Sequence, residues 1–192
     1  MNIKYILHGG LPHRPNPENN KFYKEVLNNE IRNLRVLLVY FAETEERIQH
    51  CKEQDISHFN NNRGTKELTY EIAEEKSFSE QVKRSDIIYI RGGDTLKLIG
   101  ILHQFPDATS LFDGKTVAAE SAGVYALSAC FYSKTAGGVF KGLGLVPVKT
   151  ICHYVGKNKD KLEECSQDLE YLLLSSYTFK VFNISHSSVL KN

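Results

Sequence analysis

Short apolar runs alternate with amphipathic segments along the whole chain. The apolar runs predict β-strands over residues 3–7, 36–41, 68–72, 87–90, 116–119, 149–152 and 179–184. The segments between them have apolar residues at helical spacing and predict α-helices over residues 19–31, 45–59, 78–84, 95–104, 122–131 and 160–174. Runs that are apolar at nearly every position are typical of strands buried on both faces. The alternation therefore predicts a three-layer α/β/α fold with a mostly parallel sheet.

The length of 192 residues suits one domain with a substantial core. No internal repeat or low-complexity linker interrupts the sequence, so we expect a single domain over residues 1–192. The glycine-rich stretch 134–147 predicts a loop near the functional edge of the sheet rather than an interdomain hinge.

Charge and cysteine content exclude several classes of partner. Lys plus Arg number 24 and Asp plus Glu number 23, so the chain has no broad positive field for nucleic acid or anionic membranes. No apolar stretch approaches the roughly 20 residues that a membrane span needs. The four cysteines lack the CxxC spacing of zinc and redox motifs and predict reduced thiols; they are Cys51, Cys130, Cys152 and Cys165. Together these features predict a soluble, cytoplasmic protein.

Ser121 has the sequence surroundings of a nucleophile elbow. It follows the predicted strand 116–119 and opens the predicted helix 122–131, with Ala119 and Gly123 as small neighbours. A sharp turn from strand to helix exposes the hydroxyl and directs the next N–H groups at a reacting carbonyl. Ala119 replaces the first glycine of the GxSxG pattern, so Ser121 alone fits either a catalytic elbow or a structural turn.

Other candidate residues also follow predicted strands. Ligands of open parallel sheets bind outside the carboxyl ends of the strands, where Gly92, Gly93, Ser121 and His153 are all expected. His153 is our candidate for the base that a serine nucleophile needs. The pair Gly92-Gly93 allows a close backbone approach and predicts an oxyanion hole, with a phosphate-binding turn or a plain tight turn as alternatives. The spacing matches neither GxGxxG nor GxxxxGK.

The sequence resembles the aspartyl dipeptidase (dipeptidase E) and cyanophycinase-like family of serine peptidases. Residues 88–98, Ile-Tyr-Ile-Arg-Gly-Gly-Asp-Thr-Leu-Lys-Leu, are similar to the family's strand, Gly-Gly-Asn-Thr turn and apolar helix. Residues 120–123, Glu-Ser-Ala-Gly, resemble its Ser-Ala-Gly elbow. Residues 142–147, followed by Cys152-His153-Tyr154, resemble the loop and strand that end in its catalytic Pro-His-Phe. The three blocks occur in the family's order and spacing.

This resemblance implies a fold related to class I glutamine amidotransferases, with a serine nucleophile. It implies that Ser121 attacks the scissile amide and that His153 acts first as base and then as acid. The backbone at Gly92 and Gly93, with the N–H of Ala122, would stabilise the tetrahedral intermediate. The family uses no metal or cofactor, and dipeptidase E cleaves dipeptides with an amino-terminal aspartate.

The third member of a catalytic triad is missing where the family has an acid. Ungapped comparison places Thr135 and Ala136 at one such position, and the region near the chain end has His186. Four acidic residues are possible substitutes: Glu120, Asp160, Glu163 and Asp168. Three residues near the expected site are candidate substrate contacts: Asp94, Glu120 and Tyr154. Arg91 and Lys97 fit either attraction of a substrate carboxylate or solvated positions at the start of a helix.

Two alternatives remain open at this point. The chain fits either an active peptidase for small peptides or a catalytically impaired relative that keeps the pocket as a binding module. A cysteine nucleophile, Cys152 or Cys130, is a second alternative, although neither lies at an elbow. The sequence does not determine an oligomeric state.

Overall fold

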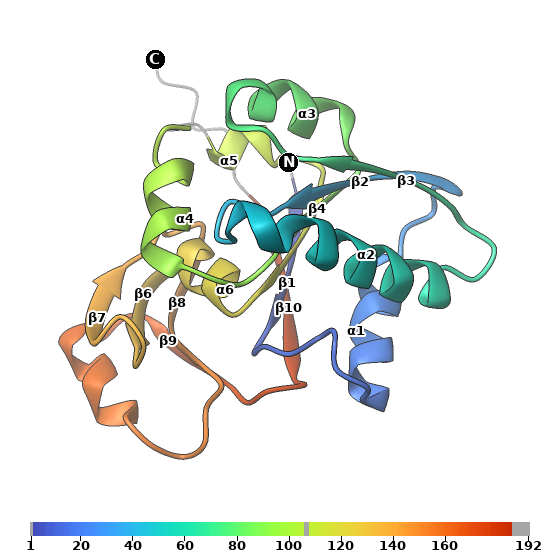
Figure 1. Ribbon diagram of the computed structural model, residues 1–192. Coiled ribbons are helices and arrows are strands. Elements are labelled where there is room, and N and C mark those ends of the chain that lie inside the picture. Colours follow the sequence, from blue (N-terminus) through green and yellow to red (C-terminus); the bar gives the residue numbers. More distant parts are fainter. Residues whose placement is uncertain (1, 106–107, 186–192) are drawn as a thin grey trace.

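Six of the seven predicted strands form one large sheet in the computed structural model, which describes residues 2–105 and 108–185 (Figure 1). The strand order is β10-β1-β5-β4-β2-β3. The strands are β1 (Asn2–His8), β2 (Asn33–Val39), β3 (Glu67–Ile72), β4 (Ile87–Ile90), β5 (Thr116–Glu120) and β10 (Phe179–Ser185). Neighbouring strands are parallel, except that β10 pairs antiparallel with β1. The predicted, mostly parallel sheet is confirmed.

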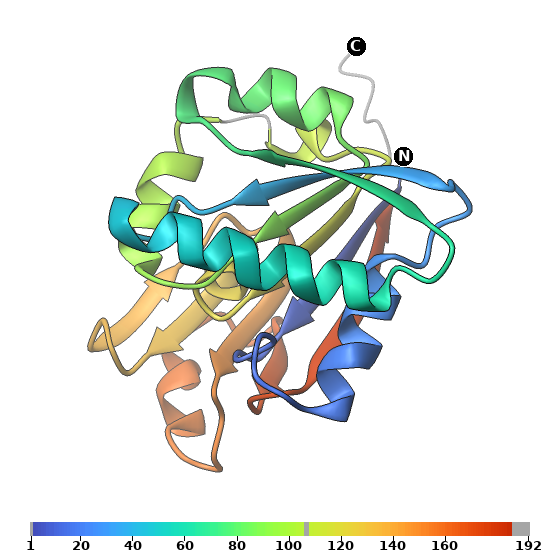
Figure 2. The same cartoon turned by 45° about the vertical axis from the view of Figure 1, so that its right-hand side comes forward.

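Helices cover this sheet on both faces. They are α1 (Pro17–Val26), α2 (Glu45–Asn62), α3 (Phe78–Arg84), α4 (Thr95–Leu102), α5 (Ala108–Leu111) and α6 (Ala122–Leu127), with the 3₁₀ helix η1 (Glu75–Ser77). A second 3₁₀ helix, η2 (Lys159–Glu164), packs against the strands of a second sheet. Figure 2 shows α2 lying across one face of the strands. Among the described residues, no helix combines the length and the apolar character that crossing a membrane requires.

The sequence pattern of β2 explains why both faces are covered. Val36 and Leu38 pack with α1 and α2, whereas Leu37 and Val39 pack with the cluster that includes α3, α4 and α6. All four side chains are buried. Because successive strand residues point to opposite faces, a continuous apolar run needs a layer on each side. The predicted three-layer α/β/α architecture is therefore confirmed.

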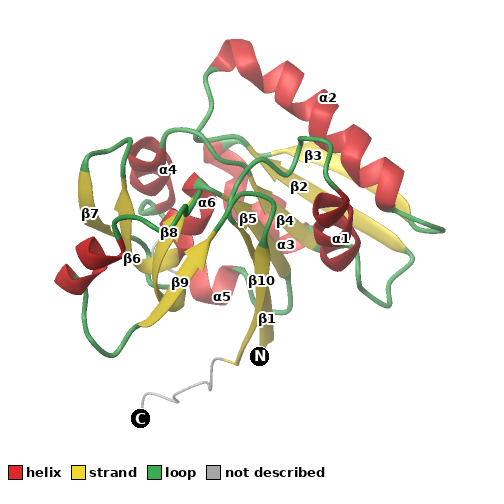
Figure 3. Cartoon of the chain, turned by 90° about the horizontal axis from the view of Figure 1, so that it is seen from below, coloured by secondary structure: helices red, strands yellow, loops and turns green. Residues whose placement is uncertain are grey.

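A second sheet of four strands is a correction to the sequence analysis. Its order is β7-β6-β8-β9, formed by β6 (Ser128–Ser133), β7 (Gly138–Lys141), β8 (Val146–Cys152) and β9 (Glu170–Leu174). Figure 3 shows it beside the large sheet, with α6 between them. The predicted helix 122–131 is wrong after Leu127, where β6 begins. The predicted α-helix 160–174 is wrong: residues 159–164 form the 3₁₀ helix η2, and residues 170–174 form β9. The predicted strand 149–152 belongs to this sheet, and the predicted loop 134–147 contains β7.

The early end of α6 has a tertiary cause. Backbone N–H groups of the segment 142–144 donate to carbonyls at the end of α6 and the start of β6, including Leu143 N–H to Ala126 O at 2.8 Å and Gly144 N–H to Ser128 O at 3.1 Å. A Cβ atom at Gly142 would lie 2.2 Å from Ser128 O, so only glycine allows this approach. A distant segment thus satisfies the helix carbonyls and ends the helix at Leu127.

The cysteines differ from the expected set of four reduced thiols. Cys130 in β6 and Cys165, directly after η2, form a disulfide across 35 positions of sequence. Cys51 and Cys152 are free and buried. The prediction of reduced thiols is therefore wrong for one pair, because the fold brings together two cysteines that no local motif links.

Candidate active site

Three strand ends meet at one edge of the large sheet. The order β1-β5-β4 makes neighbours of strands that end at His8, Glu120 and Ile90. Glycine residues, which allow close approach of two backbones, follow β1 and β4, and Ser121, which has a reactive hydroxyl, follows β5. The second sheet joins this edge through a hydrogen bond of 3.0 Å from His153 N–H, after β8, to Gly9 O, after β1. The elements therefore converge on Ser121 and His153.

Ser121 has the strained backbone of an elbow. Its φ and ψ are 46° and −105°, a region that non-glycine residues rarely adopt. Its N–H donates to His8 O at 3.1 Å, which fixes the turn to the end of β1. A Cβ atom at Gly123 would lie 2.7 Å from Ile90 O, so α6 can start this close to β4 only with glycine there. The small neighbours expected from the sequence are thus required by packing.

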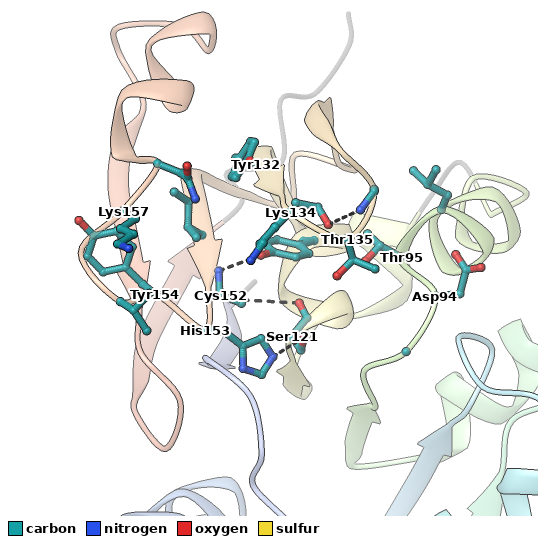
Figure 4. Close-up of a pocket in the computed structure, with 18 residues that line it drawn as sticks. Asp94, Thr95, Ser121, Tyr132, Lys134, Thr135, Cys152, His153, Tyr154 and Lys157 are labelled. Atoms are coloured by element: carbon teal, nitrogen blue, oxygen red, sulfur yellow. Dashed lines mark hydrogen bonds between the residues drawn. The ribbon is translucent and has the colours of Figure 1, made fainter.

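The hydroxyl of Ser121 faces the imidazole of His153. Ser121 Oγ lies 3.1 Å from His153 Nε2, a distance that permits a hydrogen bond and proton transfer (Figure 4). The other ring nitrogen, Nδ1, lies 3.0 Å from Ser176 Oγ. Desolvation lowers the pKa of His153 below its ordinary value of 6.5. The neutral imidazole that accepts a proton therefore predominates at neutral pH.

The backbone of Gly10 packs against the imidazole ring of His153. Gly10 has a φ of 120°, and a Cβ atom there would lie 2.1 Å from His153 Cε1. Its N–H donates to His8 Nδ1 at 3.1 Å, and His8 Nε2 lies 3.0 Å from Asn19 Oδ1. Burial lowers the pKa of His8 to about 4, so its ring is neutral and donates from Nε2. These hydrogen bonds hold the Gly10 backbone in contact with the His153 ring.

The backbone of Gly92 and Gly93 lies beside Ser121. A Cβ atom at Gly92 would lie 3.2 Å from Ser121 Cβ, and one at Gly93, where φ is 140°, would lie 2.5 Å from Ala42 O. Gly92 N–H interacts with the Glu120 carboxyl and lowers its pKa. Among the residues with described positions, the N–H groups of Gly93 and Ala122 have no hydrogen-bond acceptor. Gly93 lines the same pocket as Ser121, and Ala122 follows Ser121 directly in sequence.

Glu120 and Arg91 are not substrate contacts, which corrects two alternatives from the sequence. Both are buried in an ion cluster beneath the elbow, with Glu120 only 4% exposed. Arg91 Nη1 lies 2.7 Å from Asp55 Oδ1, and Arg91 Nε lies 3.6 Å from Glu43 Oε1 and 3.9 Å from Glu120 Oε1. Burial raises the pKa of Glu120 to about 7, against the opposing effect of Arg91.

The remaining predicted contacts lie around a pocket of about 770 Å³ above Ser121 and His153. Tyr154 and Asp94 both line it. The Asp94 carboxylate caps α4 by accepting from Lys97 N–H at 3.0 Å. Lys97 itself donates from Nζ to Glu43 O at 2.8 Å, so it is not a free surface charge.

Two lysines that the sequence analysis missed also line the pocket. Figure 4 shows Lys134, from the turn after β6, and Lys157, from the loop after β8, among the lining residues. In the part of the chain that the structure describes, neither ammonium has a carboxylate within 4.0 Å. The glycine-rich stretch 134–147 contained a signal for Lys134, because that stretch was expected near the functional edge.

The Ser176 hydroxyl lies beside His153 Nδ1, where a catalytic triad has its acid. The proposed substitutes make no hydrogen bond or ion pair with His153: Glu120, Asp160, Glu163 and Asp168. Thr135 and Ala136 line the pocket but do not bond to the ring. His186 lies outside the described residues. Ser176 was missed because it follows β9, which the sequence pattern had predicted as the end of a helix.

Neither cysteine alternative fits the geometry. Cys152 is buried, its Sγ lies 3.6 Å from Ser121 O, and burial raises its pKa, all of which suppress the thiolate. Cys130 is bonded to Cys165.

Within residues 2–105 and 108–185, no group of three or more His, Cys, Asp or Glu side chains is placed to hold a metal ion. The arrangement suits nucleophilic attack by Ser121 with His153 as base.

The chain is similar to known peptidases in sequence and in structure. The sequence matches Peptidase family S51 over residues 6–191. A peptidase from an acI-B1 Actinobacterium has a similar structure, with a TM-score of 0.65 and 21% identity over 93% of this chain and 82% of that one. A protein from Listeria monocytogenes EGD-e named as peptidase E is also similar, with a TM-score of 0.65 and 17% identity over 97% of this chain and 100% of that one. No curated protein matches the sequence.

Proposed function

Because the chain belongs to peptidase family S51 and is a serine peptidase, we propose that Ser121 and His153 hydrolyse short peptides through an acyl-enzyme. The family membership confirms the resemblance to dipeptidase E. The observation that carries the proposal is the distance of 3.1 Å between Ser121 Oγ and His153 Nε2 at a strained elbow. Strain of this kind is maintained where a side chain must be held in an otherwise unfavourable place.

In the proposed reaction, His153 Nε2 takes the proton of Ser121 Oγ while the oxygen attacks the scissile carbonyl. The N–H groups of Gly93 and Ala122 donate to the oxyanion that develops, and the backbone of Gly92 keeps the space beside Ser121 open. His153 then returns the proton to the leaving amine. A water molecule, deprotonated by the same imidazole, cleaves the acyl-enzyme and regenerates the serine.

We propose that the substrates are short peptides with a side-chain carboxylate that binds Lys134 or Lys157, Asp-X dipeptides included. The two ammonium groups line the same pocket as Ser121 and lack carboxylate partners among the described residues. Asp94 is the acidic group nearby, and its oxygen already accepts a backbone N–H. The pocket therefore offers positive charge to an anionic group, and its volume of about 770 Å³ leaves room for a dipeptide.

Hydrolysis of a dipeptide panel tests this proposal. The panel pairs Asp-X with isosteric Asn-X dipeptides, assayed with the native chain and with Ser121→Ala, Lys134→Ala and Lys157→Ala. We expect no hydrolysis with Ser121→Ala, and a KM for Asp-X raised about 10- to 100-fold by loss of the contacting lysine, because charged hydrogen bonds contribute on the order of 1.5–3 kcal/mol. The KM for Asn-X should change much less.

Lys141→Ala is the matched control, since Lys141 is exposed in β7 of the same hairpin and does not line the pocket. It should leave both KM values unchanged. Hydrolysis that survives Ser121→Ala would overturn the proposed chemistry. Equal effects of Lys134→Ala, Lys157→Ala and Lys141→Ala on Asp-X would overturn the proposed substrate class alone.

A further inference from the structure

The contact between His153 Nδ1 and Ser176 Oγ occupies the position from which a serine peptidase base is oriented. The two atoms lie 3.0 Å apart, and no described carboxylate contacts this nitrogen. Ser176 is half-buried. It has no other hydrogen-bond partner among the described residues. The hydroxyl is therefore free to serve the imidazole.

The backbone holds Ser176 firmly in this place. Its turn, residues 175–178, joins β9 to β10 and is bonded to both sides of the site. Tyr177 N–H donates to Gly10 O at 3.1 Å, and Gly9 N–H donates to Thr178 O at 2.8 Å. Ser175 Oγ donates to Tyr154 O at 3.0 Å. The segments that carry His153, Gly10 and Ser176 thus form one hydrogen-bonded unit.

We propose that Ser176 is a positioning residue that holds His153 in the tautomer needed to accept the proton of Ser121. This inference rests on the proposed function. For Nε2 to accept from Ser121, the neutral ring must carry its proton on Nδ1, and Ser176 Oγ is the acceptor for that proton. When the ring becomes positively charged, the hydroxyl oxygen continues to accept from Nδ1 and stabilises the imidazolium through its dipole.

A hydroxyl performs this role more weakly than a carboxylate. A carboxylate only accepts hydrogen bonds and so fixes the proton on Nδ1, whereas a serine hydroxyl can also donate and so permits the other tautomer. It also lacks the negative charge that stabilises an imidazolium. The geometry therefore predicts a peptidase that gains activity when an acid is placed at position 176.

Variants at position 176 test the inference with two separate measurements. The first is ¹⁵N NMR of labelled histidine in the free protein, which reports the tautomer and pKa of His153 whether or not the protein turns over. The second is kcat and KM across pH. With Ser176→Ala, we expect a mixture of tautomers and a kcat lowered about 10- to 100-fold at little change in KM, as loss of a hydrogen bond to a charged ring implies.

With Ser176→Asp, we expect Nδ1 fully protonated, a higher kcat, and an acid limb of the pH profile that moves to higher pH because the carboxylate raises the pKa of His153. Ser79→Ala removes a half-buried serine hydroxyl from α3, which makes none of the hydrogen bonds that hold this turn, and should leave the tautomer as in the native protein. The inference is overturned if Ser176→Ala retains the native tautomer and kcat, or if Ser79→Ala changes the ring as much. Failure of the proposed function would instead show as absent turnover in all variants with the Ser176-dependent NMR change intact.

Discussion

Gly10 sets how closely the backbone approaches the imidazole of His153. A side chain there would overlap the ring, because a Cβ atom would lie 2.1 Å from Cε1, and φ is 120°. Gly10 also accepts from Tyr177 N–H through its carbonyl, so it links the ring to the turn that carries Ser176. The position of the base therefore depends on the absence of a side chain at a residue outside the reacting groups.

Gly10→Ala should displace the His153 ring and lower kcat/KM by about 100-fold, since a displacement of about 1 Å can cost that much. Gly100→Ala is the matched control. Gly100 lies in α4, and a Cβ atom there would meet nothing within 4 Å, so the change should leave activity intact and favour the helix slightly. Steady-state kinetics with thermal melts would check both. Native activity in folded Gly10→Ala would contradict this account of the ring's support.

The site residues predicted from sequence share one property: each follows an apolar strand within two positions or in the turn after it. Ser121, His153 and the Gly92-Gly93 pair were placed in this way, and Gly10, which follows β1, could have been found by the same argument. Ser176 could not, because its strand was predicted as a helix and a serine hydroxyl has no distinctive pattern. The burial of Glu120 could not be predicted from sequence either, because its ion cluster includes Asp55 and Arg91, which are far apart in sequence.

At the scale of elements, the large sheet was predictable and the small sheet was not. Residues 36–39 of β2 and all of β4 are continuous apolar runs between amphipathic helices, and such runs predict buried strands in an α/β chain. The segment 128–133 follows a helix without a break, and its helix is ended only by contacts from residues 142–144. The apolar run in β9, residues 171–174, is four residues long and fits a helix or a strand by periodicity.

The disulfide between Cys130 and Cys165 joins β6 to the end of η2, within the sheet that positions His153. Closing a loop across 35 positions restricts the unfolded chain, which in the chain-entropy account stabilises the fold by about 3–4 kcal/mol. The double variant Cys130→Ser with Cys165→Ser should therefore melt at a lower temperature than the native protein. Calorimetry with and without reductant measures this.

In that experiment, reductant should lower the melting temperature of the native protein and leave that of the double variant unchanged. The double variant serves as its own control, because Cys51 and Cys152 remain in it and are free in the native fold as well. A native melting temperature that does not respond to complete reduction would contradict a stabilising role for the bond.

For the molecule as a whole, the site depends on how the two sheets meet. The large sheet supplies Ser121 and the glycine backbones, and the small sheet supplies His153, Lys134 and most of the pocket wall. The hydrogen bond from His153 N–H to Gly9 O lies at this junction. The sequence predicted that Ser121 and His153 follow strands. The distance between them depends on the packing of the small sheet against α6, which no local sequence pattern encodes.

The central claim is that Ser121 is a nucleophile activated by neutral His153, and covalent labelling tests it most directly. The native protein, Ser121→Ala and His153→Ala would be treated with a fluorophosphonate across pH 4–9, and the adduct located by peptide mass spectrometry. We predict one adduct, on Ser121, absent in Ser121→Ala and strongly slowed in His153→Ala. Its rate should rise with pH through the pKa of His153, below the ordinary 6.5, because only the neutral ring accepts the proton. A folded native protein that remains unlabelled, or an adduct on another residue, would contradict the account.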